Sequence, residues 1–588
     1  MTPAAPLLTG EAQTPAVPRK SFVDSALNLG AVLNEERFFL IISVFIGIFS
    51  GLSVVCFRLA IDWVRVGLLG AAPHAHDWRL LVVPPAVSLL IAILVIHVFP
   101  LVRGSGVNQT KAALYIFNGY IPFRTAVGKF ITAALAIGCG HSLGPEDPSL
   151  QIGASIASAL GRRMNFSREK LRLLAPIGAA AGLAAAFNAP ISAVLFVIEE
   201  VIGRWTAGIL GSVVLSAISS VVIVRWFFGS EALFRIPIVT LVHPIELAAY
   251  AVLGLAGALA AVVFSHAIAY LRPRVRAWPR TSQYFLPSCA GLIIGLFGYL
   301  GAPQVMGAGY QYMDEAMHGH FTWQFLALLV LLKIVATVLS FVSGTPGGMF
   351  APTLFIGAML GGSIGGLEHI LYPHLTGTIG TYALVGMGVL FAAFLRAPMT
   401  SVFMVLEVSG SYSIILPVIV ANTLAYVLSR TLQPTAIFDI LTRQDGLDLP
   451  SMEEQREEHV LRVEDAMEPY AGPVLNSEMS IAEANKRITD VAGDVFLVQM
   501  RPSGWTSASR DLLRRLVSEG KSDLTLASAL PSTRLPYMHP DFPLDSALRY
   551  VSETPIVPVV SRADFRTLEG VISSQAVLNR YRVVPREL

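Results

Sequence analysis

The sequence predicts a polytopic α-helical membrane protein built from two related halves, followed by a soluble α/β domain. Hydrophobic residues make up 54% of the 588 residues and charged residues only 14%, whereas soluble domains carry about 25% charged residues. Apolar segments follow one another from about Phe38 to about Arg430, and a mixed apolar and polar pattern returns after Leu461. The net charge of +2 is too small to indicate a nucleic-acid partner.

The membrane domain is expected over residues 37–446. The first residues, Met1–Lys20, lack the apolar run of a cleavable signal peptide, and we assign residues 1–36 to a cytoplasmic N-terminal segment. Many apolar segments are interrupted by glycine, or are shorter or longer than the roughly 20 residues of a simple membrane span. We therefore expect more than a dozen helices, several of them broken or re-entrant.

An internal repeat relates the two parts of this domain. Pro148–Ala154 reads PSLQIGA and Pro352–Ala358 reads PTLFIGA. Further along, Ile191–Glu199 (ISAVLFVIE) matches Met399–Glu407 (MTSVFMVLE) in the same order and at nearly the same separation. Duplicated halves with broken helices are typical of transporters with inverted repeats, whose sites lie between the halves. The halves are expected at about 37–240 and 241–446.

The stretch Gly144–Gly153 places two carboxylates, Glu146 and Asp147, inside this apolar region. A charge at membrane depth is costly, so an acid there is a candidate functional residue. Pro148 is suited to the first position of a helix, which would place Glu146 beside free N–H groups. This pattern indicates a place where an anion and a glutamate compete. The alternative is an ordinary acidic loop at the membrane face.

Four segments resemble the CLC family of chloride channels and chloride/proton exchangers. They are Gly104–Asn108 (GSGVN), Gly144–Pro148 (GPEDP), Leu183–Glu200 and Gly348–Pro352 (GMFAP). The resemblance extends from about Phe38 to Gly446 in the family's order and spacing. It implies a CLC-type fold with inverted repeats and a homodimer that has one anion pathway in each subunit.

The resemblance also implies an anion site. Ser105, in its loop with Gly106, and the backbone amides of Met349 and Phe350 would bind the central chloride. Phe438 falls at the family's pore tyrosine, where it keeps the ring but lacks the hydroxyl group. Glycine-rich loops at helix N-termini offer N–H donors without a fixed cation that would hold the ion too tightly. The alternative for Ser105 is a serine that caps a helix.

Two acids would carry the proton by the same resemblance. Glu146 corresponds to the external gate, which occupies an anion site when ionised and swings out when protonated. Glu200 corresponds to the inner proton-transfer acid, and its alternative is a helix-end carboxylate that faces cytosolic water. Glu199 recurs in the second half as Glu407, whereas Glu200 is replaced there by Val408. The repeated acid is therefore expected to be structural.

The sequence departs from the family pattern at several positions that bear on selectivity, affinity and coupling. Pro145 replaces the basic residue before the gate, which removes an N–H group as well as a charge. Asp147 replaces the glycine after it, and Asn108 stands in place of a proline. Lys111 falls where some exchangers have a second buried acid. These changes leave the fold prediction unaffected.

The C-terminal part, 461–588, follows a charged linker at 447–460 and is expected to be cytoplasmic. Strand-like runs occur at Val495–Val498 and Ile556–Val560. Val463–Met467 and Leu568–Ser573 resemble the opening and the close of a pair of cystathionine-β-synthase-type (CBS) modules. Such pairs can bind adenine nucleotides, and no other cofactor is expected. The alternative is a packing role that steadies the dimer on its cytoplasmic side.

The function expected from these features is proton-coupled chloride antiport across a lipid membrane, with Glu146 as gate and Glu200 as inner acid. The alternative is a passive chloride channel of the same family. A cation-coupled solute carrier would need acids that face a cation, and an intramembrane hydrolase would need a nucleophile with a base beside it. Helix N-termini around the site argue against a bound cation, and Ser105 has no evident histidine partner in the sequence. A non-enzymatic transporter is therefore expected, and the bacterial inner membrane is its expected location.

Overall fold

The computed structural model describes residues 22–581 except 71–74, 165, 167, 204–206, 231–233, 235–242, 280, 375, 448, 450–460, 502–503, 531–534 and 553. The chain forms two compact units, Met1–Arg456 and Glu457–Leu588. Most of the expected linker, 447–460, and residues 1–21 of the expected N-terminal segment lie outside the described residues. Each unit is considered by itself below.

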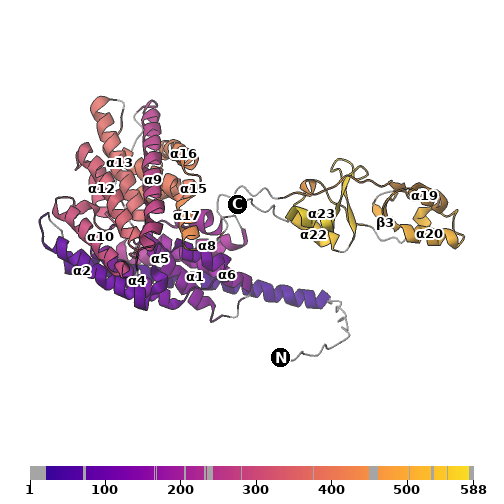
Figure 1. The fold of residues 1–588 in the computed structure, drawn as a ribbon, viewed down its shortest axis with the longest axis horizontal. Helices are drawn as coiled ribbons and strands as arrows, with labels where there is room; N and C mark the ends of the chain where they lie inside the picture. The colour runs from indigo at the N-terminus through magenta and orange to yellow at the C-terminus, as the bar shows by residue number, and fades with distance from the viewer. Residues whose placement is uncertain are drawn as a thin grey trace. The chain divides into compact units, whose positions relative to one another are not determined.

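The first unit is entirely helical over its described residues (Figure 1). Its α-helices are α1 (Phe22–Leu69), α2 (Arg79–Ile93), α3 (Val107–Tyr115), α4 (Phe123–Gly138), α5 (Glu146–Gly161), α6 (Arg168–Phe187), α7 (Pro190–Phe196), α8 (Ala207–Phe228), α9 (Glu246–Arg276), α10 (Ser282–Tyr299), α11 (Tyr310–Met317), α12 (Trp323–Val342), α13 (Phe350–Leu371), α14 (Ile379–Leu395), α15 (Pro398–Ser409), α16 (Ile415–Leu432) and α17 (Ile437–Gln444). Short π- or 3₁₀-helical segments lie at η1 (Leu94–Val98), η2 (Pro100–Val102), η3 (Val197–Ile202) and η4 (Pro303–Val305).

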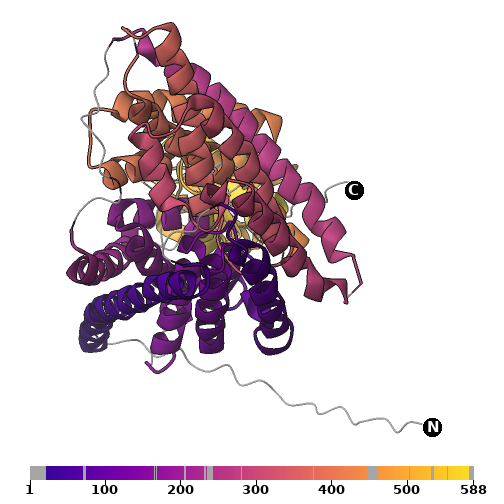
Figure 2. The same cartoon turned by 90° about the vertical axis from the view of Figure 1, so that its left-hand side faces the viewer.

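The expected succession of more than a dozen helices is confirmed, and 8 of the described helices are long and apolar enough to cross a membrane. In α1 the stretch that meets this condition is Arg37–Leu69. Two shorter apolar helices, α14 (Ile379–Leu395) and α15 (Pro398–Ser409), accompany them. Figure 2 shows the earlier helices, in indigo and purple, and the later ones, in magenta to orange, as two adjacent groups.

Glycines let the central helices of each group touch through their backbones. A Cβ atom added to Gly153 in α5 would lie 2.2 Å from the carbonyl oxygen of Gly178 in α6. The corresponding pair in the later helices is Gly357 in α13 and Gly386 in α14, where the same distance would be 2.3 Å. Small residues permit this close approach in membrane proteins, where packing between helices replaces the hydrophobic effect.

Two acids link the groups by capping each other's helices. Both α7 and α15 begin with a proline, which is favoured at the first helical position. Glu199 accepts hydrogen bonds from the backbone N–H (2.9 Å) and the hydroxyl (2.6 Å) of Thr400 at the start of α15. Glu407 accepts the equivalent bonds from Ser192 at the start of α7, at 2.8 and 2.5 Å. The predicted structural role of the repeated acid is therefore confirmed.

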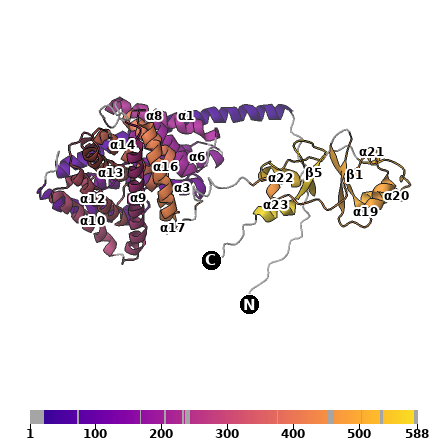
Figure 3. The ribbon, with the colours of Figure 1, turned by 90° about the horizontal axis from the view of Figure 1, so that it is seen from above.

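The second unit contains two small sheets, each with its own hydrophobic core and helices (Figure 3). Strands β1 (Leu475–Asn476), β2 (Val495–Gln499) and β3 (Trp505–Ser509) form one sheet, in which β1 is parallel to β2 and β3 is antiparallel to it. Strands β4 (Ile556–Val560) and β5 (Leu568–Ser573) form an antiparallel pair. The accompanying helices are η5 (Val463–Asp465), α19 (Ile481–Ile488), α20 (Arg510–Ser518), α21 (Leu526–Ala529), α22 (Leu544–Val551) and α23 (Ser574–Tyr581). The two strands predicted from aliphatic runs are confirmed as β2 and β4.

Replacing Gly153 or Gly357 by valine is expected to destabilise the first unit, because the added side chain overlaps the backbone of the facing helix. Overpacking of this kind costs about 1–3 kcal/mol. Thermal unfolding of the purified protein in detergent measures the effect. Gly208→Val is the control, since a Cβ atom at this position in α8 meets nothing within 4 Å. Equal unfolding temperatures for all three variants would contradict the backbone contact.

Candidate functional site

The candidate site lies where α5 and α13 begin beside each other. Just before these helices, Gly144 and Gly348 exchange two backbone hydrogen bonds, each 2.9 Å long, and so form an isolated antiparallel bridge. A Cβ atom on Gly144 would lie 2.9 Å from Cβ and 3.0 Å from the backbone N of Ala351, so a larger residue would crowd the start of α13. The bridge brings together two helix N-termini, whose first N–H groups have no partner within their own helices.

Two buried carboxylates accept hydrogen bonds from backbone N–H groups at this junction. Glu146 and Asp147 are both completely buried. Oε2 of Glu146 accepts a hydrogen bond from Ala351 N at 3.3 Å, and Oδ2 of Asp147 accepts one from Met349 N at 2.9 Å. The other oxygen of each carboxylate has no hydrogen-bond partner among the described residues. The Met349 amide, which the resemblance assigned to chloride, is thus in contact with a side chain of the protein itself.

The loop that carries Ser105 packs against the same end of α5. Gly106 has a φ of +113°, and a Cβ atom there would lie 2.8 Å from Cβ of Gln151 and 3.0 Å from the carbonyl oxygen of Asp147. The hydroxyl of Ser105 accepts a hydrogen bond from Val107 N at 3.3 Å, but the N-cap of α3 is Gly106 and no side chain caps this helix, so Ser105 does not serve as its cap. A hydroxyl oxygen that accepts this bond still has its own proton free to donate.

A cluster of aromatic rings surrounds Phe350, the first residue of α13. The ring centroid of Phe350 lies 6.4 Å from that of Phe438, so the structure brings these two predicted residues together. Phe196 lies 4.9 Å from Phe350 and 6.5 Å from Phe438. Phe187 and Phe391 complete the cluster at 6.0 and 5.5 Å from Phe350. Sequence reasoning missed these last three rings because nothing distinguishes them from other apolar residues of their helices.

Glu200 is buried in an ion-paired cluster. Its side chain is 3% exposed, so the alternative of a carboxylate that faces water is wrong. Lys111 on α3 donates a hydrogen bond to Glu200 and lies 3.5 Å from the carboxylate of Asp439 on α17. The sequence placed Lys111 at an acid position of some exchangers but gave no sign of its partners, which come from distant segments.

A second buried lysine holds the Ser105 loop in place. Nζ of Lys129 donates hydrogen bonds to the carbonyl oxygens of Val102 and Gly104, and Lys129 also attracts Asp147 electrostatically. Lys333 makes the same kind of contact in the later helices, to the carbonyl oxygens of Val305 (2.9 Å) and Gly307 (2.8 Å). Buried ammonium groups are costly unless they are hydrogen-bonded, and these loop carbonyls supply the bonds.

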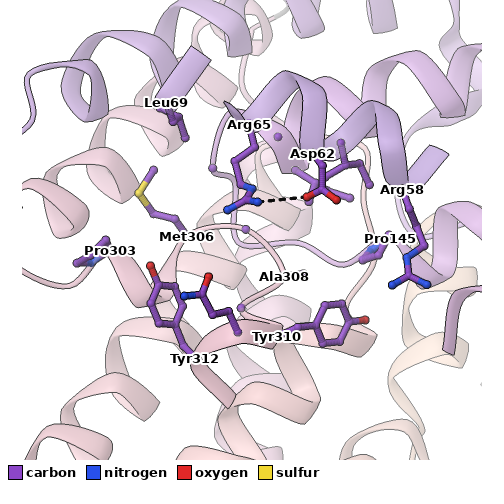
Figure 4. Close-up of a pocket in the computed structure, with 17 residues that line it drawn as sticks. Arg58, Asp62, Arg65, Leu69, Pro145, Pro303, Met306, Ala308, Tyr310 and Tyr312 are labelled. Atoms are coloured by element: carbon purple, nitrogen blue, oxygen red, sulfur yellow. Dashed lines mark hydrogen bonds and ion pairs between the residues drawn. The ribbon is translucent and has the colours of Figure 1, made fainter. Parts of the chain in front are cut away.

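A cavity of about 290 Å³ lies beside Pro145, the residue before Glu146 (Figure 4). Its lining includes Arg58 and Arg65 of α1, the loop around Ala308, and Pro145, which directly precedes Glu146. Arg58 attracts the Glu146 carboxylate electrostatically. A cation from a helix far away in sequence therefore stands near the gate candidate, where the motif itself has lost its basic residue to Pro145.

Lys111→Met is expected to lower the free energy of unfolding by about 3–5 kcal/mol, because it removes the buried cation that donates to the Glu200 carboxylate. Thermal unfolding in detergent measures the loss. Combining it with Glu200→Gln should restore part of the stability. Arg65→Met is the control, since its pair with Asp62 is exposed and worth less than about 1 kcal/mol. Equal effects of Lys111→Met and Arg65→Met would show that the buried pair is unimportant.

Comparison with known proteins finds related chains that match most of the first unit. The family model described as "Voltage gated chloride channel" matches residues 87–430. A ClcB-like protein of Ralstonia nicotianae is 33% identical over 70% of this chain and 99% of its own length. The H(+)/Cl(-) exchange transporter ClcA of Salmonella arizonae is 32% identical over 69% of this chain and 89% of its own.

Solved structures agree with this assignment. A slow cyanobacterial Cl⁻/H⁺ antiporter matches with a TM-score of 0.64 at 25% identity, over 69% of this chain and 97% of its own. A eukaryotic CLC transporter, at 20% identity, has the same fold with a TM-score of 0.60 over 92% of this chain and 97% of its own. From its helices, the converging starts of α5 and α13, and these matches, we conclude that the chain belongs to the voltage-gated chloride channel (CLC) family.

Proposed function

We propose that this protein exchanges chloride for protons across a membrane, by one pathway in each subunit. The observation that carries the proposal is the buried Glu146 carboxylate, which accepts a hydrogen bond from Ala351 N where two helix N-termini meet. The Salmonella and cyanobacterial relatives are named as exchangers of the same two ions, which supports this substrate pair.

Glu146 serves as the gate in this proposal. When ionised, its carboxylate is an anion that occupies a backbone N–H donor at the start of α13. When protonated, it loses its charge and gives up that donor to a chloride ion. Protonation of one carboxylate and binding of one chloride are therefore linked at the same N–H donor. This competition couples the two ions through backbone donors, which carry only partial charges.

Chloride would be bound by Ser105, Gly106 and the amides of Met349 and Phe350, with the ring of Phe438 beside them. The contact of the Gly106 loop with α5 and the 6.4 Å between the Phe350 and Phe438 rings support this set. A buried anion needs donors to replace its lost water, and glycine loops expose such donors. The missing hydroxyl of Phe438 leaves the site with one donor fewer than the family pattern has.

Glu200 would transfer protons at the inner end of the pathway. Its burial supports a specialised role, and Lys111 and Asp439 lie around it. The same cluster favours the second candidate, a passive chloride channel of this family. Lys111 occupies one side of the carboxylate that would have to exchange protons, and Phe438 leaves the anion less firmly held.

The organisation of the membrane unit forms part of the proposal. We infer that residues 37–240 and 241–446 are inverted repeats, supported by the matched glycine contacts and the reciprocal caps of Glu199 and Glu407. We further infer a homodimer in a bacterial inner membrane, with residues 1–36 on the cytoplasmic side. The apolar surface of the candidate membrane helices supports contact with lipid.

The second unit, 461–588, is proposed to be a cytoplasmic CBS pair. Two small sheets with separate hydrophobic cores support a pair of modules. An adenine nucleotide is its proposed ligand, and a purely packing role is the alternative. Neither role is required for the ion exchange proposed above.

Proton uptake by proteoliposomes under a chloride gradient tests the function. Uphill proton movement is expected in the native protein. Glu146→Gln should abolish it while chloride still flows, because a neutral amide carries no proton. Glu200→Gln should reduce proton movement at least tenfold and keep chloride flux. Glu315→Gln, an acid on α11 outside the proposed pathway, is the control.

Each other result has a definite meaning. Chloride flux without proton movement in the native protein would favour the channel. A complete lack of chloride flux in the native protein would overturn chloride transport as its function. Proton coupling that survives in Glu146→Gln would remove this residue from the gate.

A further inference from the structure

Asp147 is the feature of the site that the exchange mechanism does not use. It stands where the family pattern has a glycine, is completely buried, and accepts a hydrogen bond from Met349 N at 2.9 Å. The acid beside it, Glu146, takes the amide of Ala351, two residues further along the same helix start. Two consecutive residues of α5 thus present their carboxylates to the first amides of α13.

The Asp147 carboxylate fits closely where it lies. A Cβ atom added to Gly348 would be 2.9 Å from Cβ, Cγ and Oδ2 of Asp147. The direct hydrogen bond of 2.9 Å leaves no room for an ion between this carboxylate and the Met349 amide. Chloride and the Asp147 carboxylate therefore cannot use that N–H group at the same time.

The carboxylate is nevertheless held by few bonds. Its Oδ1 atom has no hydrogen-bond partner among the described residues. Lys129 attracts it electrostatically, but the ammonium group of Lys129 donates to the carbonyl oxygens of Val102 and Gly104. A buried carboxylate with one hydrogen bond is far from the two or three that hold such groups firmly. Displacement of Asp147 breaks only the bond to Met349 N.

Gln151, a neighbour of Asp147 on α5, has a buried side-chain amide without a hydrogen-bond partner among the described residues. Gln151 lies one helical turn after Asp147 on the same face of α5. Its side-chain amide is fully buried, and neither Nε2 nor Oε1 has a partner among the described residues. The side chain lies against Gly106, the loop proposed to bind chloride. An anion bound at Met349 N in place of Asp147 would find this second donor nearby.

We propose that Asp147 is a tethered competitor for the anion: chloride binds the Met349 amide only by displacing the Asp147 carboxylate, and Gln151 Nε2 then donates to the bound ion. This inference rests on the proposed function, since it assigns the anion to the junction of α5 and α13. Asp147 sets the chloride affinity of the site, whereas Glu146 couples chloride to the proton. The native protein is accordingly a low-affinity chloride binder that works at high chloride concentration.

Calorimetric titration of the purified full-length protein with chloride tests the proposal. Asp147→Gly restores the family's residue and should tighten chloride binding at least about tenfold, which corresponds to the loss of one charge-assisted competitor. Asp147→Asn keeps the shape but removes the charge, and should give an intermediate affinity. Gln151→Leu in the Asp147→Gly background should weaken binding again. Asp314→Asn, on α11, is the matched control and should leave the affinity unchanged.

Unchanged or weaker chloride binding in both Asp147 variants, with native unfolding temperatures, would overturn this inference. Chloride-driven flux in the native protein would then still support the proposed function. If neither the native protein nor Asp147→Gly binds chloride, the proposed function fails as well. Tighter binding by Asp147→Gly without any proton coupling would support the competitor and reject only the exchange mechanism.

Discussion

The backbone bridge between Gly144 and Gly348 is the constraint on which the rest of the site depends. Two hydrogen bonds between loops more than two hundred residues apart fix the starts of α5 and α13 side by side. A Cβ atom on Gly348 would lie 2.9 Å from the side chain of Asp147, and one on Gly144 would lie 2.9 Å from Cβ of Ala351, so a side chain at either position would crowd the helix starts. The Met349 and Ala351 N–H groups at the start of α13 then meet the carboxylates of Asp147 and Glu146. This geometry supports the proposed anion site.

The buried lysines of the first unit are each balanced by polar groups in direct contact with them. Lys111 is neutralised by carboxylates from two other helices, whereas Lys129 and Lys333 are held by loop carbonyls. The acids at the junction accept hydrogen bonds from backbone N–H groups, and Arg58 and Lys129 attract them electrostatically. An anion bound by amides can be released, because amides carry only partial charges.

Sequence patterns predicted the general architecture well and the local contacts of the site poorly. Helix number, the repeated segments and the positions of Ser105, Glu146 and Phe350 were all accessible, because each depends on residues close together in the chain. The approach of Arg58 to Glu146 and the pairing of Lys111 with Glu200 depend on how distant helices pack. The occupation of the Met349 amide by Asp147 was equally hidden, since the direction of a side chain is decided by its three-dimensional surroundings.

The reciprocal caps of Glu199 and Glu407 have a consequence for how the chain is made. The carboxylate that completes the start of α7 belongs to α15, which is synthesised more than two hundred residues later. Until then the first N–H groups of α7 lack this partner, and Glu199 lacks the helix that it caps. Neither half can reach its final structure during its own synthesis. The start of α7 therefore gains its cap only when α15 is present. A chain that ends between the halves lacks both the Glu407 cap of α7 and the helix that Glu199 caps.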